Sequence, residues 1–217
     1  MEIIWHGHAC FEIRTSGSTV VIDPHDGSSL GIYPPRTKAD IVLVTHDHFD
    51  HNAVRVVSME GTKVYREAKE WTEVAGGIKI RTVTVPHDKS GGASRGLVNA
   101  FMISSEDILI AHLGDIGDIP RNIKEFEGVD ILMIPVGGYY TVEPNEAKEI
   151  ADRIMPRVVI PMHYKVMGLA LNIKPVDHFL EQYEQNRVVR VGRGVEVSRK
   201  LLDDIDPKSY EVWVFSL

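Results

Sequence analysis

Three histidines and two aspartates lie close together in the segment His46-Asp47-His48-Phe49-Asp50-His51. The segment follows Ile41-Val42-Leu43-Val44, a short apolar run that is typical of a β-strand buried on both faces. A helix would place His46 and His48 about 200° apart around its axis, whereas an extended or looping backbone lets both side chains face one point. Imidazole and carboxylate groups together suit a divalent ion such as zinc, iron or manganese. The segment therefore predicts a metal site on a loop at the end of a buried strand.

Histidine or aspartate also follows three later apolar runs. These segments are Val85-Pro86-His87-Asp88, Ala111-His112-Leu113-Gly114-Asp115 and Pro161-Met162-His163-Tyr164. An apolar run of this kind buries its strand in the sheet, while the end of the strand opens at the sheet edge. Four such ends can therefore bring their polar side chains to one site.

The apolar segments of the 217 residues predict one α/β domain, residues 1–217, with short strands in the first half and alternating strands and helices in the second. Strands or β-structure are expected at Glu2–His6, Ala9–Arg14, Thr19–Ile22, Ile41–Val44, Trp71–Ala75, Ile78–Val85, Val98–Ile103, Asp107–Ala111, Ile131–Val136, Val158–Met162, Val188–Ser198 and Tyr210–Phe215. A helical turn or two is expected at Asn52–Ser58, and further helices at Ile119–Glu127, Glu143–Met155 and Pro175–Asn186.

Composition narrows the class of protein. Hydrophobic residues make up 43% of the chain and charged residues 25%, the composition of a soluble globular protein. The single cysteine, Cys10, excludes an internal disulfide, and residues 1–14 lack the pattern of a secretory signal, so we expect a cytoplasmic protein. No apolar stretch approaches the roughly 20 residues that span a bilayer, so no membrane association is expected. The 24 lysines and arginines against 31 aspartates and glutamates give a net charge of −7, which disfavours nucleic acid as a partner.

The ordered set His46-x-His48-x-Asp50-His51, His87, Gly114-Asp115 and His163 resembles the motifs of the metallo-β-lactamase superfamily. Other segments are similar to the branch of small metal-dependent hydrolases that includes the ascorbate-6-phosphate lactonases. They are Trp5-His6-Gly7-His8-Ala9-Cys10-Phe11, Val21-Ile22-Asp23-Pro24, Ile134-Pro135-Val136-Gly137-Gly138 and Ile160-Pro161-Met162-His163-Tyr164. The resemblance implies an α/β fold, a four-layer αβ/βα sandwich, with metal ions in a groove at one edge between the two sheets.

The resemblance also implies a ligand set for two divalent ions per chain, with zinc expected and manganese or iron as alternatives. The ligands are imidazoles and carboxylates: His46, His48 and His87 for one ion, Asp50, His51 and His163 for the second, and Asp115 as a bridge between them. The implied reaction is attack of a metal-bound hydroxide on a small ester, lactone or phosphodiester. Asp50 and Asp115 would be the catalytic carboxylates, with Asp50 orienting the hydroxide or taking up its proton.

Two residues are expected just outside these ligands. Asp23 resembles the strand-end aspartate that hydrogen-bonds a ligand histidine in the family, although an Asp-Pro turn alone would also explain it. His112 lies three residues before Asp115 and competes with His87 for the first ion. We expect His87 to be the ligand and His112 to lie behind the ligands.

Three further residues have expected or open roles near the substrate. Tyr140, after the Gly137-Gly138 turn, can present its hydroxyl to a substrate, and Lys165 can attract a phosphate or carboxylate. For His8, in the turn after the first strand, two interpretations stay open. It either lines the pocket or is a buried histidine bonded to the backbone.

A small-molecule hydrolase is the leading functional hypothesis, and alternatives remain. Relatives with this motif set include nucleases that process RNA or DNA, and flavodiiron proteins that use iron at the same ligands beside an attached flavin domain. A protein that binds metal without turnover is a further alternative. A homo-oligomer is also open, because the alternating residues of Tyr210–Phe215 suit pairing across an interface as well as packing within one chain.

Overall fold

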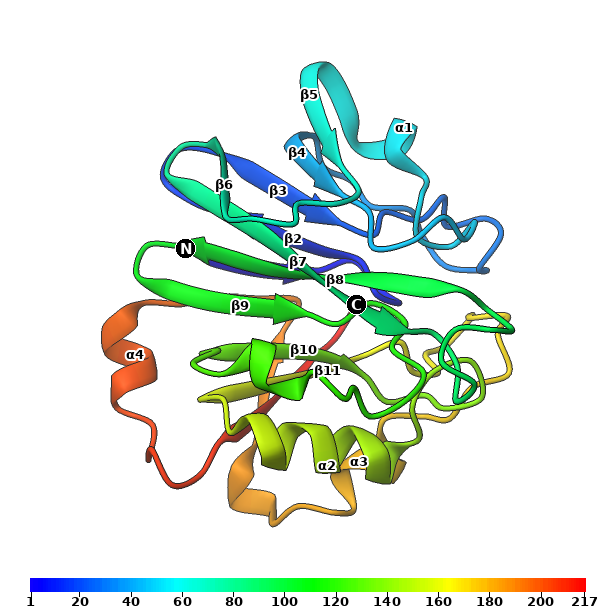
Figure 1. The fold of residues 1–217 in the computed structure, drawn as a ribbon, viewed down its shortest axis with the longest axis vertical. Helices are drawn as coiled ribbons and strands as arrows, with labels where there is room; N and C mark the ends of the chain where they lie inside the picture. The colour runs from blue at the N-terminus through cyan, green and yellow to red at the C-terminus, as the bar shows by residue number, and fades with distance from the viewer.

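Two mixed β-sheets pack face to face in the computed structural model, which describes residues 1–217 (Figure 1). The first sheet has the strand order β13 (Gly194–Glu196), β1 (Glu2–Trp5), β2 (Phe11–Arg14), β3 (Thr19–Ile22), β4 (Ala39–Leu43) and β5 (Ser58–Tyr65). Strands β13, β1, β2 and β3 pair antiparallel, and β3, β4 and β5 pair parallel. As a result β1, β3 and β4 all run in the same direction.

The second sheet is larger and again joins a parallel half to an antiparallel half. Its strand order is β12 (Val188–Gly192), β14 (Glu211–Phe215), β11 (Val158–Met162), β10 (Ile131–Pro135), β9 (Ile108–His112), β8 (Leu97–Ser105), β7 (Ile78–Pro86) and β6 (Thr72–Ala75). Pairing is parallel from β12 to β9 and antiparallel from β9 to β6. Strands β7, β9 and β11 therefore share one direction. This arrangement is that of the metallo-β-lactamase fold, which the resemblance of the motifs implies.

The main hydrophobic core contains 50 buried residues; it lies between the two sheets and continues beneath the helix that covers the second sheet. Alternation along β2 sends Phe11 and Ile13 into this core and Glu12 to the opposite face of the sheet. Every residue of β10 and β11 is buried, because the helix α2 (Pro144–Ile154) covers the outer face of this part of the sheet. Burial on both faces explains why the sequences of these two strands are almost uniformly apolar.

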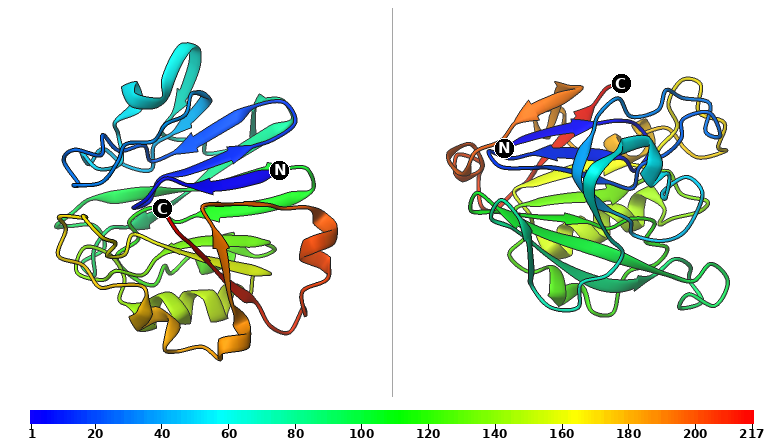
Figure 2. Two further views of the ribbon diagram at one scale, coloured as in Figure 1. Left: turned by 180° about the vertical axis from the view of Figure 1, so that it is seen from behind. Right: turned by 90° about the horizontal axis from the view of Figure 1, so that it is seen from above.

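The helix α2 has clear start and stop signals. Glu143 and Glu146 form a reciprocal capping box, Pro144 occupies the first turn, and Met155 ends the helix in a left-handed conformation before Pro156. The outer face of the first sheet, in contrast, carries only α1 (Val54–Val57), a single turn (Figure 2). The fourth layer of the sandwich is therefore thin.

Some predicted helices are shorter in the structure. The segment expected to be helical at Pro175–Asn186 forms only α3 (Asp177–Leu180) and, later, the 3-10 turn η2 (Gln185–Arg187). Between them the backbone N–H groups of Gln182 and Tyr183 bond to carbonyls three residues back, which tightens the chain out of the α-helix.

The expected helix at Ile119–Glu127 is a 3-10 turn, η1 (Ile123–Phe126), anchored by the fully buried Phe126. The segment expected as β-structure at Val188–Ser198 divides between the two sheets as β12 and β13. A short helix follows, α4 (Arg199–Asp203), which the sequence did not predict. Its start is capped by Ser198, whose side chain accepts a hydrogen bond from the backbone of Leu201.

Strand β14 lies inside the second sheet, paired on one side with β12 and on the other with β11. Both of its edges are therefore occupied within the chain, which agrees with packing within one chain as the explanation of its sequence. None of the helices is long and apolar enough to cross a bilayer.

Candidate metal centre

The carboxyl ends of six strands meet at one edge of the sandwich. Strands β1, β3 and β4 come from the first sheet, and β7, β9 and β11 come from the second. Because the strands of each set run in one direction, the loops that follow them lie at the same edge, on the right in Figure 1. These loops carry His8, Asp23, His46, His48, Asp50, His51, His87, Asp115 and His163.

His46, His48 and His87 form the first group of candidate ligands, with one nitrogen of each within 4.8 Å of the others. His46 Nε2 lies 3.0 Å from His48 Nδ1, and His87 Nε2 lies 3.3 Å from the same atom. Two nitrogens that are each 2.0–2.1 Å from a tetrahedral zinc ion stand about 3.3 Å apart. The two distances to His48 are thus close to the spacing expected of nitrogens around one ion.

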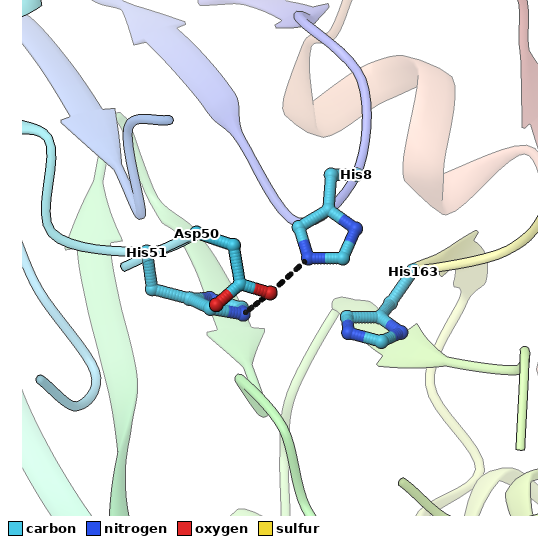
Figure 3. A group of neighbouring side chains, drawn as sticks. All are labelled: His8, Asp50, His51 and His163. Atoms are coloured by element: carbon cyan, nitrogen blue, oxygen red, sulfur yellow. Dashed lines mark hydrogen bonds and ion pairs between the residues drawn. The ribbon is translucent and has the colours of Figure 1, made fainter. Parts of the chain in front are cut away.

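His8, Asp50, His51 and His163 form the second group, again with their candidate ligand atoms within 4.8 Å of one another (Figure 3). All four residues are buried. Asp50 Oδ2 lies 2.9 Å from His8 Nε2 and 3.5 Å from His51 Nε2. The side chains come from the ends of β1 and β11 and from the loop after β4, so both sheets contribute to this group.

Asp115 lies between the two groups and is 3% exposed. Its Oδ1 is 3.3 Å from His51 Nε2, and its Oδ2 is 3.3 Å from His163 Nε2, both in the second group. Oδ2 is also 3.7 Å from His87 Nε2 and 3.9 Å from His46 Nε2, both in the first group. One carboxylate therefore faces nitrogens of both groups.

The residues of this centre fit a divalent cation. His51 Nε2 and Asp115 Oδ1 are buried without a hydrogen-bond partner, although they face each other. Burial would lower the pKa of His51, but Asp115, Asp23 and Asp50 together hold this pKa well above its usual range. Buried carboxylates that raise the pKa of a buried imidazole in this way require positive charge among them. A bound divalent ion supplies such charge, and the unpartnered nitrogen and oxygen atoms are suitable donors to it.

Asp23 fixes one imidazole of each group through hydrogen bonds, His51 directly and His46 through Thr45. It is fully buried and accepts three hydrogen bonds: from Thr45 N at 2.8 Å, Thr45 Oγ1 at 2.7 Å and His51 Nδ1 at 2.9 Å. Since the Thr45 hydroxyl donates to Asp23, its oxygen accepts the proton of His46 Nδ1, 2.9 Å away. The network thus assigns the protons of His46 and His51 to Nδ1 and turns both Nε2 lone pairs toward the centre.

Burial also keeps most of the first group uncharged. Burial, with a smaller contribution from the nearby His51, lowers the pKa of His46 to about 4. The pKa of His87 is lowered as well, mainly by burial. A metal ion does not have to displace protons from these two imidazoles near neutral pH.

Comparisons with known proteins give the family. A model described as a β-lactamase superfamily domain matches residues 2–163. The UPF0173 protein of Pyrococcus abyssi is 32% identical over 189 residues, which cover 77% of this chain and 85% of that protein. A relative from Caldivirga maquilingensis, named a UPF0173 metal-dependent hydrolase, is 34% identical over 186 residues, or 74% of this chain and 80% of that one. The chain belongs to the UPF0173 metal-dependent hydrolases of the metallo-β-lactamase superfamily.

A solved structure agrees with this UPF0173 assignment over nearly the whole chain. It is a protein from Thermotoga maritima that is described as a proposed Zn-dependent hydrolase of the metallo-β-lactamase superfamily. Its crystal structure superposes with a TM-score of 0.75 at 35% identity and covers 99% of this chain and 97% of that one.

In this UPF0173 chain His87, and not His112, lies with the first group. His112 Nε2 donates to the backbone oxygen of Ala9 at 2.9 Å, and its Nδ1 accepts from Gly114 N at 3.2 Å. Both ring nitrogens are therefore engaged by the backbone. His112 packs behind the ligands, where its ring stands edge-on to Phe11.

The two expected substrate contacts have partners of their own. The Lys165 ammonium donates to the carbonyl oxygens of Leu169 and Leu171, so the structure holds it within its own loop. Tyr140 is half-buried on the loop after β10, with the guanidinium of Arg95 4.8 Å from the centre of its ring. Arg95 comes from the glycine-rich loop after His87, so these two loops meet beside the centre.

Two residues of the centre were not foreseen as members of it. His8 was expected either to line the pocket or to be a buried histidine bonded to the backbone. It is buried among the candidate ligands, and its side chain bonds to the Asp50 carboxylate. Thr45 carried no expectation at all. The sequence did carry a sign of the role of His8, because this histidine also follows a strand. It carried none for Thr45, because the role of Thr45 depends on the contacts of its hydroxyl group.

Proposed function

We propose that this UPF0173 metal-dependent hydrolase cleaves a small ester, lactone or phosphodiester with two divalent ions per chain, and that zinc is the ion. The observation that carries the proposal is the position of Asp115. Its two oxygens face nitrogens of both donor groups at 3.3 to 3.9 Å. A single ion would leave one of the two groups of clustered donors without an ion to bind.

The residues would hold two ions in distinct surroundings. His46, His48 and His87 offer three neutral nitrogens, and Asp50, His51 and His163 offer two nitrogens and a carboxylate, with Asp115 shared. When bound, the ions would make water a nucleophile near neutral pH and polarise the carbonyl or phosphoryl oxygen under attack.

Asp50 is the protein group best placed to handle a proton in this reaction. It is 7% exposed, and it belongs to the second donor group. Burial would raise the pKa of Asp50, but His51 and His8 beside it hold that pKa well below its usual range. Asp50 therefore enters the reaction as a carboxylate, able to orient an attacking water and accept its proton.

The charges near the site favour a small substrate over nucleic acid. Lys89 is paired with Glu146 and Lys174 with Glu143, so the lysines on the neighbouring loops are neutralised. The net charge of −7 also disfavours binding to a phosphate backbone. Among small substrates, the resemblance to ascorbate-6-phosphate lactonases favours a lactone.

The proposal is tested by steady-state kinetics of the zinc-reconstituted protein on three probes: a γ-lactone, a p-nitrophenyl ester and bis-p-nitrophenyl phosphate. Asp50→Asn should reduce kcat on the accepted probe by about 100-fold or more, since it removes the proton acceptor. Asp47→Asn is the matched control, because Asp47 is in the same loop with its side chain 79% exposed, and it should retain activity. Equal activity of wild type and Asp50→Asn, or no turnover of any probe by the metal-loaded protein, would contradict the proposal.

A further inference from the structure

His8 adopts a backbone conformation that L-residues usually avoid. Its φ is 54°, in the left-handed region, and it follows Gly7 with φ 92°. A residue with a Cβ atom is strained in this conformation, whereas glycine at the same position would not be. Backbone strain of this kind is frequent at ligand and active sites, so the contacts of the His8 side chain decide whether it has a role here.

The side chain of His8 is buried against Asp50 and His163, two other members of the second group. The residue is fully buried, and its ring centre lies 4.1 Å from that of His163. Its Nε2 is 2.9 Å from Asp50 Oδ2, the shortest polar contact of that carboxylate (Figure 3). The other ring nitrogen, Nδ1, has no hydrogen-bond partner.

The backbone of His8 ties the same turn to the end of β11. Its carbonyl oxygen accepts hydrogen bonds from His163 N at 3.0 Å and from Trp5 Nε1 at 3.1 Å. The turn therefore cannot move away from His163 without losing both bonds. The position of the His8 ring relative to Asp50 and His163 is set by these contacts together with the left-handed backbone.

We propose that His8 is a positioning residue, whose Nε2–H holds the Asp50 carboxylate in the orientation that the second metal site needs. The inference rests on the proposed two-ion function and adds to it a residue outside the superfamily motif set. Asp50 lies in a loop, directly after the exposed residues His48 and Phe49. A fixed donor from the other side of the centre limits the rotation of its carboxylate.

The position allows an informative pair of substitutions. His8→Gly removes the donor and relieves the backbone strain. His8→Asn also removes the ring but retains a side-chain N–H donor, and asparagine tolerates the left-handed region better than most residues. Met155→Gly is the control for strain relief alone, because Met155 has φ 52°, ends α2 and is 44% exposed.

The test is a zinc competition titration against a chromophoric chelator, which reports two affinities per chain. We expect His8→Gly to weaken one of the two affinities 10–100-fold and to leave the other unchanged, with His8→Asn intermediate and Met155→Gly like wild type. An equal loss at both ions, or no loss at either, would overturn the proposal. The readout is independent of turnover. A wild type that binds two ions and hydrolyses no probe would contradict the proposed function and still decide the role of His8.

Discussion

Replacing Asp23 with asparagine keeps the shape of this buried side chain but reverses the hydrogen-bonding polarity of one of its two ends. The amide oxygen can still accept from Thr45 N, as Asp23 Oδ1 does at 2.8 Å. The amide NH₂ then faces Thr45 Oγ1 and His51 Nδ1, which both donate to Asp23 Oδ2 in the structure. The site is fully buried, so water cannot mediate between these donors.

Both conflicts are relieved by moving protons on the two imidazoles. His51 can accept from the amide at Nδ1 only if its proton moves to Nε2. Thr45 can accept from the amide only if its hydroxyl turns to donate to His46 Nδ1, which moves the His46 proton to Nε2 as well. Each Nε2 then carries a hydrogen instead of a lone pair toward the centre, and neither is a ligand without a tautomer change.

Asp23→Asn should therefore weaken both metal affinities by 10–100-fold, about 1.4–2.7 kcal/mol each, and should destabilise the metal-free protein less than Asp23→Ala does. Asp23→Ala instead leaves buried donors unsatisfied at about 1–3 kcal/mol each, so it should also destabilise the metal-free protein. Zinc competition titration and urea unfolding in chelator measure the two effects separately. Wild-type affinities in Asp23→Asn, or a loss at one ion only, would refute the reasoning.

Three further predictions concern other parts of the molecule. His87→Ala should lower zinc affinity more than His112→Ala, because only His87 lies with the first donor group; the opposite order in a competition titration would move that ligand to His112. Removing metal with a chelator should lower Tm but leave the far-UV circular dichroism intact, since the 50-residue core between the sheets does not depend on the centre; complete unfolding would contradict this. Burial is the main cause that lowers the pKa of His25 to about 4, so between pH 6.5 and 4 the unfolded chain binds a proton that the folded chain does not. As the pH is lowered from 6.5 to 4, the free energy of unfolding in chelator should thus decrease by up to about 3 kcal/mol more for wild type than for His25→Asn. Parallel curves for the two proteins would contradict this prediction.

Much of the centre could be predicted from the sequence because the fold places polar residues by a simple rule. His46, His87 and His163 each follow an apolar run, and parallel strands of a sandwich bring such ends to one edge. The same runs predicted an α/β domain, and the resemblance of the motif set to the metallo-β-lactamase superfamily implied the sandwich fold; the structure and the comparisons confirm this fold.

Other features depend on contacts that the order of residues does not encode. The role of Thr45 follows from the direction of one hydroxyl, and that of His8 from a left-handed turn that carries its ring to Asp50. Helical spacing at Pro175–Asn186 predicted a helix, but tight turns around Tyr183 replace most of it. There the packing of Tyr183 against Tyr210, with ring centres 5.9 Å apart, outweighs local helix preference.

The central claim is that one chain holds two metal ions in separate donor groups that share Asp115. Its most direct test is the metal content per chain after zinc reconstitution and removal of excess metal, determined by elemental analysis for wild type, His87→Ala and His163→Ala. The arrangement predicts two equivalents in wild type and one in each variant, with a different ion lost in each. A single equivalent in wild type, or the loss of both ions in either variant, would contradict it.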